Sequence, residues 1–180
     1  MINKELLEAQ LADLPLYIYA FIDPKDLEFS SRIRWICENE CPMHGQSWAC
    51  PPGVGCVTEC QKRCEQYENC LMISSITEVN DISDMNETLA TRPEHEALTN
   101  QVRDVMRQLG TDPYILSTEA CAECERCAYL DGEPCRMPDR MHPCIESYGI
   151  NVIPVLEENG LDFQYGSNIV TWYSLLFFNE

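Results

Sequence analysis

Apolar residues recur at helical spacing in three stretches of the chain. Near the start, four leucines follow Asn3, a capping residue, and predict an amphipathic helix over 3–14. Apolar side chains at every third or fourth position predict a longer helix over 94–109, ended by Gly110. A shorter helix is predicted over 152–159, ended by Gly160.

Short apolar runs between these stretches predict strands at 16–22, 71–76 and 114–117, and a last strand within 169–178. Residues 77–93 are acidic and polar without a core pattern, which predicts a surface loop. Strands and helices alternate along the chain. We therefore expect one α+β (or α/β) domain over 1–180, with one sheet packed by helices and two irregular cysteine-rich segments.

The chain has 12 cysteines, and they fall into two groups, 37–70 and 121–144. A chain of 180 residues buries a core without disulfide staples, so the cysteines need another explanation. No export signal precedes them, and the apolar run at 169–178 is too short to span a bilayer. These features favour a reducing cytoplasm, where clustered cysteines indicate metal or redox chemistry.

The charge is strongly acidic, with 30 acidic against 12 basic residues and a formal net charge of −18. Such a charge repels nucleic acid and anionic lipid, so neither is an expected partner. A redox partner protein with a basic patch would complement it. Acidity that simply keeps the protein soluble is the alternative explanation.

The second cysteine group has the most specific spacing. Cys121, Cys124 and Cys127 form a C-x2-C-x2-C run, and Cys135 follows between Pro134 and Pro138. Three closely spaced thiolates can each bind a separate iron of a [4Fe-4S] cluster, whereas zinc sites more often use two separated C-x2-C pairs. The spacing favours iron–sulfur over zinc. Cys144 is an alternative fourth ligand, but Cys135 is nearer and better constrained.

The first group begins with Cys37, Cys41 and Cys50, the last followed by two prolines. A proline also follows a cluster cysteine in bacterial ferredoxins. Either a fourth ligand comes from Cys56, Cys60, Cys64 or Cys70, or one iron is open. A helix predicted over 58–69, capped by Thr58, puts Cys60 in its first turn, where the positive helix end stabilises a thiolate. We rank Cys60 first and Cys56 second, with His44 as a less favoured ligand.

Over 34–178 the sequence resembles the DUF2284 family of predicted metal-binding proteins of anaerobic bacteria and archaea. The resemblance implies an iron–sulfur protein without naming a reaction. In that family's pattern a serine is usual where Cys144 stands and an aromatic residue where His44 stands, which argues against both as shared ligands. The shared residues are Arg34, Cys37, Cys41, Gly45, Cys50, Pro51, Pro52, Cys121, Cys124, Cys127, Pro134, Cys135, Arg136, Pro138, Glu146, Gly149, Ile150 and Val152.

Three functions are compatible with these patterns. The leading hypothesis is electron transfer through two [4Fe-4S] clusters, held by Cys37, Cys41, Cys50 and Cys60 and by Cys121, Cys124, Cys127 and Cys135. The second is an enzyme in which the first cluster has an open iron. The third is a zinc-stabilised structural or adaptor module, and metal delivery or sensing ranks last. No hydrolase triad, phosphate loop or dinucleotide motif is present, so enzymatic activity is left open.

Overall fold

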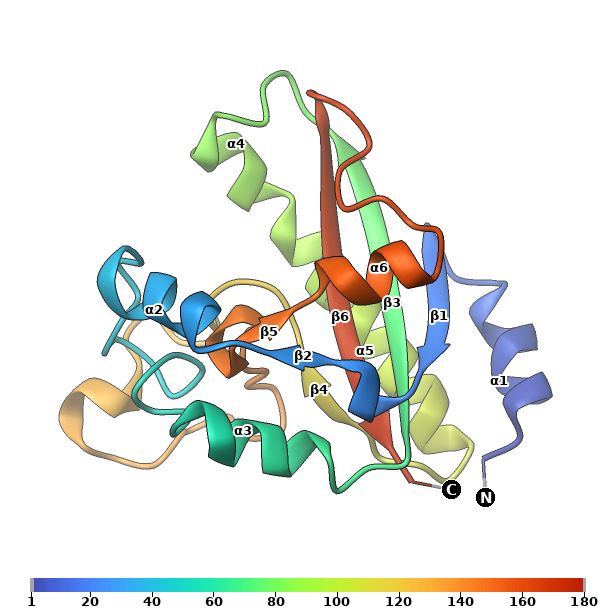
Figure 1. Ribbon diagram of the computed structural model, residues 1–180, viewed down its shortest axis with the longest axis horizontal. Coiled ribbons are helices and arrows are strands. Elements are labelled where there is room, and N and C mark those ends of the chain that lie inside the picture. Colours follow the sequence, from blue (N-terminus) through green and yellow to red (C-terminus); the bar gives the residue numbers. More distant parts are fainter. Residues whose placement is uncertain (1, 180) are drawn as a thin grey trace.

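A four-stranded antiparallel sheet forms the centre of the computed structural model, which describes residues 2–179 (Figure 1). Its strand order is β1–β3–β6–β4. The two long central strands pair along their whole length, from Asn69 opposite Phe178 to Glu78 opposite Ile169. The strands are β1 (Ile18–Ile22), β3 (Asn69–Glu78), β4 (Tyr114–Leu116) and β6 (Ile169–Phe178).

One face of the sheet is covered by α1 (Lys4–Leu11) and α5 (Arg92–Gln108). Alternate residues of β3 point to this face, so Leu71 and Ile73 pack with the apolar stripes of the two helices. Figure 1 shows α5 behind the sheet and α6 in front of it. The central strands are apolar on both faces because both faces are covered.

The other face is covered by short elements. They are η1 (Pro24–Asp26), β2 (Glu28–Phe29), α3 (Val57–Cys64), η3 (Glu146–Tyr148), β5 (Ile150–Asn151) and α6 (Ile153–Glu158). Strands β2 and β5 form a second, two-stranded antiparallel sheet. Met72 and Leu116 of the main sheet belong to the core cluster on this face, together with Tyr148 and Leu156.

The remaining helices are α2 (Ser31–Asn39), α4 (Met85–Ala90) and η2 (Ala128–Asp131). Figure 1 shows α2, the loop at 40–56 and the loop at 118–145 beside one another at one end of the molecule. Trp48 connects the two loops, since its Nε1 donates a hydrogen bond to the Glu133 carbonyl at 3.0 Å and its ring packs on Tyr129. Both cysteine-bearing loops therefore lie at the same end of the main sheet.

The α+β fold is confirmed, and α1, α5, α6 and the four sheet strands lie where the sequence predicts them. Two differences affect the cysteines. The first residues of the segment 37–70, expected to be irregular, belong to α2, which Ser30 caps by accepting a hydrogen bond from the Arg32 amide. Helix α3 begins at Val57 with Cys56 as its cap and ends at Cys64, earlier at both ends than predicted.

Residues 77–93 also differ from the expected surface loop. They include the end of β3, the short helix α4 and the start of α5. Asp84 caps α4 by accepting hydrogen bonds from two backbone amides, and Val79 is buried against Val170 and Trp172. Within residues 2–179, every helix falls short of the length and apolar character needed to cross a membrane.

Candidate metal centres

The second cysteine group lies in the long connection between β4 and η3. Cys121, Cys124, Cys127 and Cys135 line one cavity, as their spacing suggests. The space between the side chains is narrow, about 20 Å³, so a bound cluster requires the loop to open around it. Four thiols around one space form a donor set that suits an iron–sulfur cluster.

Charged contacts fold the loop back on itself. The Arg126 guanidinium binds the Asp131 carboxylate at 2.7 Å, and Arg136 donates to the Arg126 carbonyl at 2.8 Å. Arg140 forms an ion pair with Glu123 at 2.9 Å, next to Cys124. Arg136 thus stabilises the loop backbone, which agrees with a structural role for this residue.

Cys37, Cys41 and Cys50 of the first group line a separate cavity of about 270 Å³. Cys37 is on the last turns of α2, and the other two are on the loop that follows it. Cys144 is the fourth cysteine of this cavity, and its sulfur accepts a hydrogen bond from the Ser147 amide at 3.2 Å. The structure therefore places four cysteines around each of two cavities.

Helix α2 reaches this cavity through a close backbone contact with η3. The Ser30 amide donates to the Gly149 carbonyl at 2.7 Å, and Gly149 has a φ of +76°. A Cβ at Gly149 would stand 2.9 Å from the Ser30 carbonyl oxygen, so only glycine allows the approach. This contact sets the distance between Cys37 on α2 and Cys144 just before η3.

Cys60 lies elsewhere. It is fully buried in the core with Cys64 and Cys70 and does not line the 270 Å³ cavity. Its sulfur contacts the Val54 carbonyl and accepts from Arg34, each at 3.5 Å. Because α3 is capped by Cys56 and not by Thr58, Cys60 falls a full turn inside the helix, on the face that packs on the sheet. Cys56 is exposed at the cap and is also outside the cavity.

The spacing disfavours Cys144 as a ligand, yet the backbone fixes it at the first group. It pairs with Ser117 in an isolated parallel bridge, which ties it to the end of β4. Its side chain is buried, and the Glu146 carboxyl lies 3.4 Å from its sulfur. The 93 residues between Cys50 and Cys144 hide this proximity, because it depends on contacts between distant segments, among them the Ser117–Cys144 bridge and the Ser30–Gly149 hydrogen bond.

The thiols of the first group are held in an environment that disfavours charge. Burial, and after it the nearby Glu146 carboxylate, raise the pKa of Cys37 to about 11. Burial likewise raises the pKa of Cys50 to about 11. A thiol must lose its proton to bind a metal, so metal binding at this cavity releases protons.

The two cavities lie side by side. Ser47 lines the cavity of the second group, and Cys50, three residues later, lines that of the first. Cys121 of the second group is near enough to Cys50 to contribute, after burial, to the raised pKa of that thiol. Within residues 2–179, no three cysteine, histidine or acidic side chains converge as ligands around a single metal ion.

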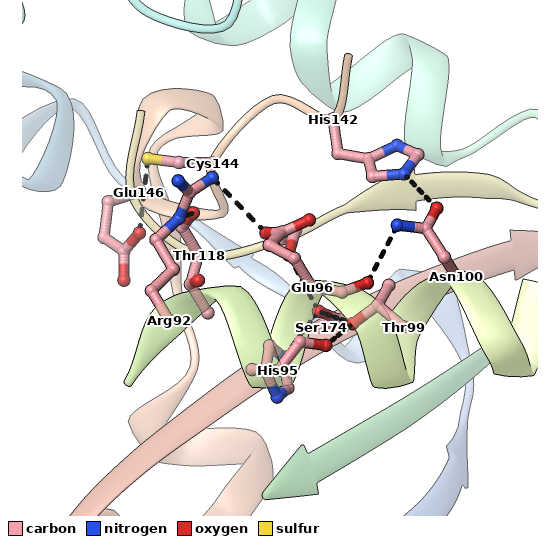
Figure 2. A network of polar contacts seen from close by, with 11 residues as sticks. Arg92, His95, Glu96, Thr99, Asn100, Thr118, His142, Cys144, Glu146 and Ser174 are labelled. Atoms are coloured by element: carbon pink, nitrogen blue, oxygen red, sulfur yellow. Dashed lines mark hydrogen bonds and ion pairs between the residues drawn. The ribbon is translucent and has the colours of Figure 1, made fainter. Parts of the chain in front are cut away.

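A buried polar network supports the start of the second loop (Figure 2). The Glu96 carboxylate on α5 accepts a hydrogen bond from the Ser117 hydroxyl at 2.5 Å and pairs with Arg92 at 3.5 Å. Arg92 Nε donates to the Thr118 carbonyl at 3.1 Å. These contacts fix the backbone three residues before Cys121. Sequence reasoning does not find these contacts, because the α5 pattern reports only the helix's apolar stripe.

A family model described as a predicted metal-binding protein (DUF2284) matches residues 20–178. The match covers both cysteine groups and every strand of the main sheet except the first residues of β1. Comparison with curated proteins found no match, and comparison with solved structures found none.

Proposed function

The chain belongs to the DUF2284 family of predicted metal-binding proteins, and from this premise we propose that it holds two [4Fe-4S] clusters and transfers electrons to a partner protein. The observation that carries the proposal is the pair of adjacent cavities, each lined by four cysteines. Two such sites close together can pass electrons from one to the other, and electron transfer needs no substrate pocket.

The ligands we propose follow from the positions of the side chains. Cys121, Cys124, Cys127 and Cys135 would hold one cluster, and Cys37, Cys41, Cys50 and Cys144 the other. Cys144 takes the place that the spacing alone assigned to Cys60. In the family's pattern a serine is usual at that position, so a cysteine ligand there would be a property of this chain.

The donor set favours iron–sulfur clusters over zinc. Each group supplies four soft sulfur ligands and no histidine among them, and the first surrounds about 270 Å³ of space. A cluster offers each cysteine its own iron atom, which suits sulfurs spread around a cavity. When bound, such a group accepts and releases single electrons. The protein would bind it, shield it from water and keep the two sites adjacent.

Electrons would leave toward a partner with a basic patch in a reducing cytoplasm, because the net charge of −18 attracts a cationic surface. A fourth cysteine at the first cavity supports a closed site, in which all irons are bound by protein. An enzyme with an open iron is the second candidate, and the observation in its favour is that His44, Glu119 and Glu146 also line this cavity.

Metal and sulfide analysis of anaerobically prepared protein tests the proposal. We expect brown protein with about eight irons and about eight acid-labile sulfides per chain. Colourless protein with one or two zinc ions would favour the structural module. Clusters whose spectrum changes on addition of a small thiol or anion would favour the enzyme.

A further inference from the structure

A third cavity, of about 180 Å³, lies next to the cavity of the first cysteine group. It is bounded by the segment after β4, by η3 and by β6. Glu119 and Glu146 line both cavities, so these two side chains separate them. No cysteine is among the described residues that line the third cavity, so this cavity is distinct from the candidate metal centres.

Two buried hydroxyl groups line this cavity without a hydrogen-bond partner. They are Thr118 Oγ1 and Thr171 Oγ1, and they are two of the three such side-chain atoms within residues 2–179. Thr118 is only 7% exposed. An unpaired buried polar group destabilises the folded state, so two beside one space indicate a missing polar partner.

The other walls are acidic and aromatic. Glu119 and Glu146 supply carboxyl groups, and no described basic side chain lines the cavity. The Trp172 ring is fixed by its Nε1, which donates to the Thr91 hydroxyl at 2.8 Å, and the Tyr173 ring stacks on Phe163. Acidic groups together with aromatic rings are the features that recognise organic cations.

The backbone at Glu119 also sets this site apart. Glu119 has a φ of +56°, the only positive φ of a non-glycine residue within residues 2–179. This left-handed conformation is strained for a side chain such as glutamate, and strain of this kind concentrates at ligand sites. Here it places a carboxylate between two cavities.

We propose that this cavity binds a small organic cation, an amine or quaternary ammonium ion. Its volume is comparable to that of an engineered cavity of about 150 Å³ that holds benzene, so the ligand has roughly five to eight non-hydrogen atoms. The ammonium group lies against Glu119 and donates to the threonine hydroxyls where it carries N–H groups, and its carbon atoms contact the aromatic rings. Binding does not depend on the identity of the metal.

Calorimetry on the anaerobically prepared full chain at about 0.15 M salt tests this, because that ionic strength screens nonspecific attraction to the acidic surface. The probes are n-butylammonium and tetramethylammonium, with butanol and butyrate as neutral and anionic counterparts. We expect one saturable site for at least one cation and none for the counterparts. Equal binding of all four probes, or no saturable binding, would overturn the proposal.

Variants separate a ligand site from a structural defect. Glu119→Gln should weaken cation binding by about tenfold or more, because it removes the charge of a charged hydrogen bond. Thr118→Val should raise the melting temperature of the unliganded protein and weaken n-butylammonium binding severalfold. Glu158→Gln, at an exposed position on α6, is the matched control and should bind normally. A Thr118→Val protein that is stabilised but binds the amine unchanged would contradict the assignment.

The metal analysis keeps this result independent of the proposed function. If the chain holds clusters, a bound cation beside Glu119 and Glu146 should shift the spectrum of the first one. If it holds zinc or no metal, calorimetry still reports binding. A protein that carries about eight irons but binds no cation would reject this inference and leave the proposed function intact.

Discussion

At the scale of single residues, the same side chain serves two purposes in this protein. Eight cysteines line the two cavities, whereas Cys60, Cys64 and Cys70 are fully buried in the core between α3 and the sheet. A buried free cysteine packs as a small hydrophobic residue. What distinguishes the two populations is the surface each sulfur faces, a loop cavity or the sheet.

Cys144 and Cys60 give the sharpest comparison. We expect Cys144→Ala to lower the iron content from about eight to about four per chain, or to leave a three-iron species visible by electron paramagnetic resonance. Cys60→Ala should keep the iron content and lower the melting temperature only modestly, as a core truncation does. Cys64→Ala is the control for a buried sulfur that lies in the same core. Iron loss from Cys60→Ala alone would restore the original ranking of ligands.

His95 should make the protein sensitive to acid. Both ring nitrogens contact hydroxyl groups, Ser75 Oγ at 2.7 Å and Ser174 Oγ at 2.8 Å, and burial lowers the pKa of the imidazole from 6.5 to about 4. The unfolded chain then binds the proton more readily than the folded one. The stability that neutral His95 contributes to the folded protein is about 3 kcal/mol. It is fully present above pH 6.5 and is lost as the pH falls toward 4.

Thermal melts of the wild type and His95→Gln between pH 7 and pH 4 measure this contribution. The melting temperature of the wild type should fall more steeply with acid than that of the variant. His44→Gln, at an exposed histidine, should follow the wild type. Parallel pH profiles for all three proteins would show that other groups determine the acid sensitivity.

At the scale of elements, the long periodic segments could be predicted and the cysteine segments could not. Helix α5 and the strands β3 and β6 have strong apolar patterns and lie at the predicted positions. Helix α2 is short and Arg34 is its only buried residue, so no buried apolar stripe marks it, although Ser30 is a good cap. Its position depends on the contact between Ser30 and Gly149, which are far apart in the sequence.

The candidate site divides in the same way. The four cysteines of the second group are close in sequence, so their spacing alone predicts that they line one site. They are Cys121, Cys124, Cys127 and Cys135. The fourth side chain of the first cavity depends on a bridge between Ser117 and Cys144, and no local pattern reports such a bridge. The assignment of Cys60 came from placing the helix cap at Thr58, two residues after the actual cap at Cys56.

The loop of the second group should respond to metal. Its cysteines enclose only about 20 Å³, and the ion pair between Arg126 and Asp131 within the loop joins two exposed side chains. Ligation energy in such a segment is also folding energy. We expect trypsin to cut after Arg126 or Arg136 quickly in metal-free protein and slowly in metal-loaded protein, as followed by mass spectrometry. Cleavage after Arg107, in the last turn of α5, is the internal control and should change little.

At the scale of the whole molecule, the two cysteine loops lie together on the β4 side of the sheet, while α1 lies on the opposite side, next to β1 (Figure 1). Strands β3 and β6 contribute side chains to the core clusters on both faces of the sheet, so they join the two layers of helices and loops. Under the proposed function, a basic redox partner would reach the clusters from this side, and acidic residues there would guide it.

Electron transfer to a basic acceptor should therefore depend on where acidic residues lie, as well as on their number. Glu125 and Glu133 are exposed on the loop of the second group, and Glu157 and Glu158 are exposed on α6. Replacing either pair by lysine changes the net charge equally.

Cytochrome c serves as the basic acceptor, and stopped-flow spectroscopy follows the oxidation of the reduced protein. At low salt we expect the oxidation to slow about tenfold or more for the loop pair, and less for the α6 pair. The reason is that electrostatic steering acts most strongly near the contact site. The difference should shrink as the salt rises, because surface charges are screened over about 10 Å at 0.1 M. Equal slowing by both pairs would mean that net charge alone governs the encounter and that electrons do not leave through the second group.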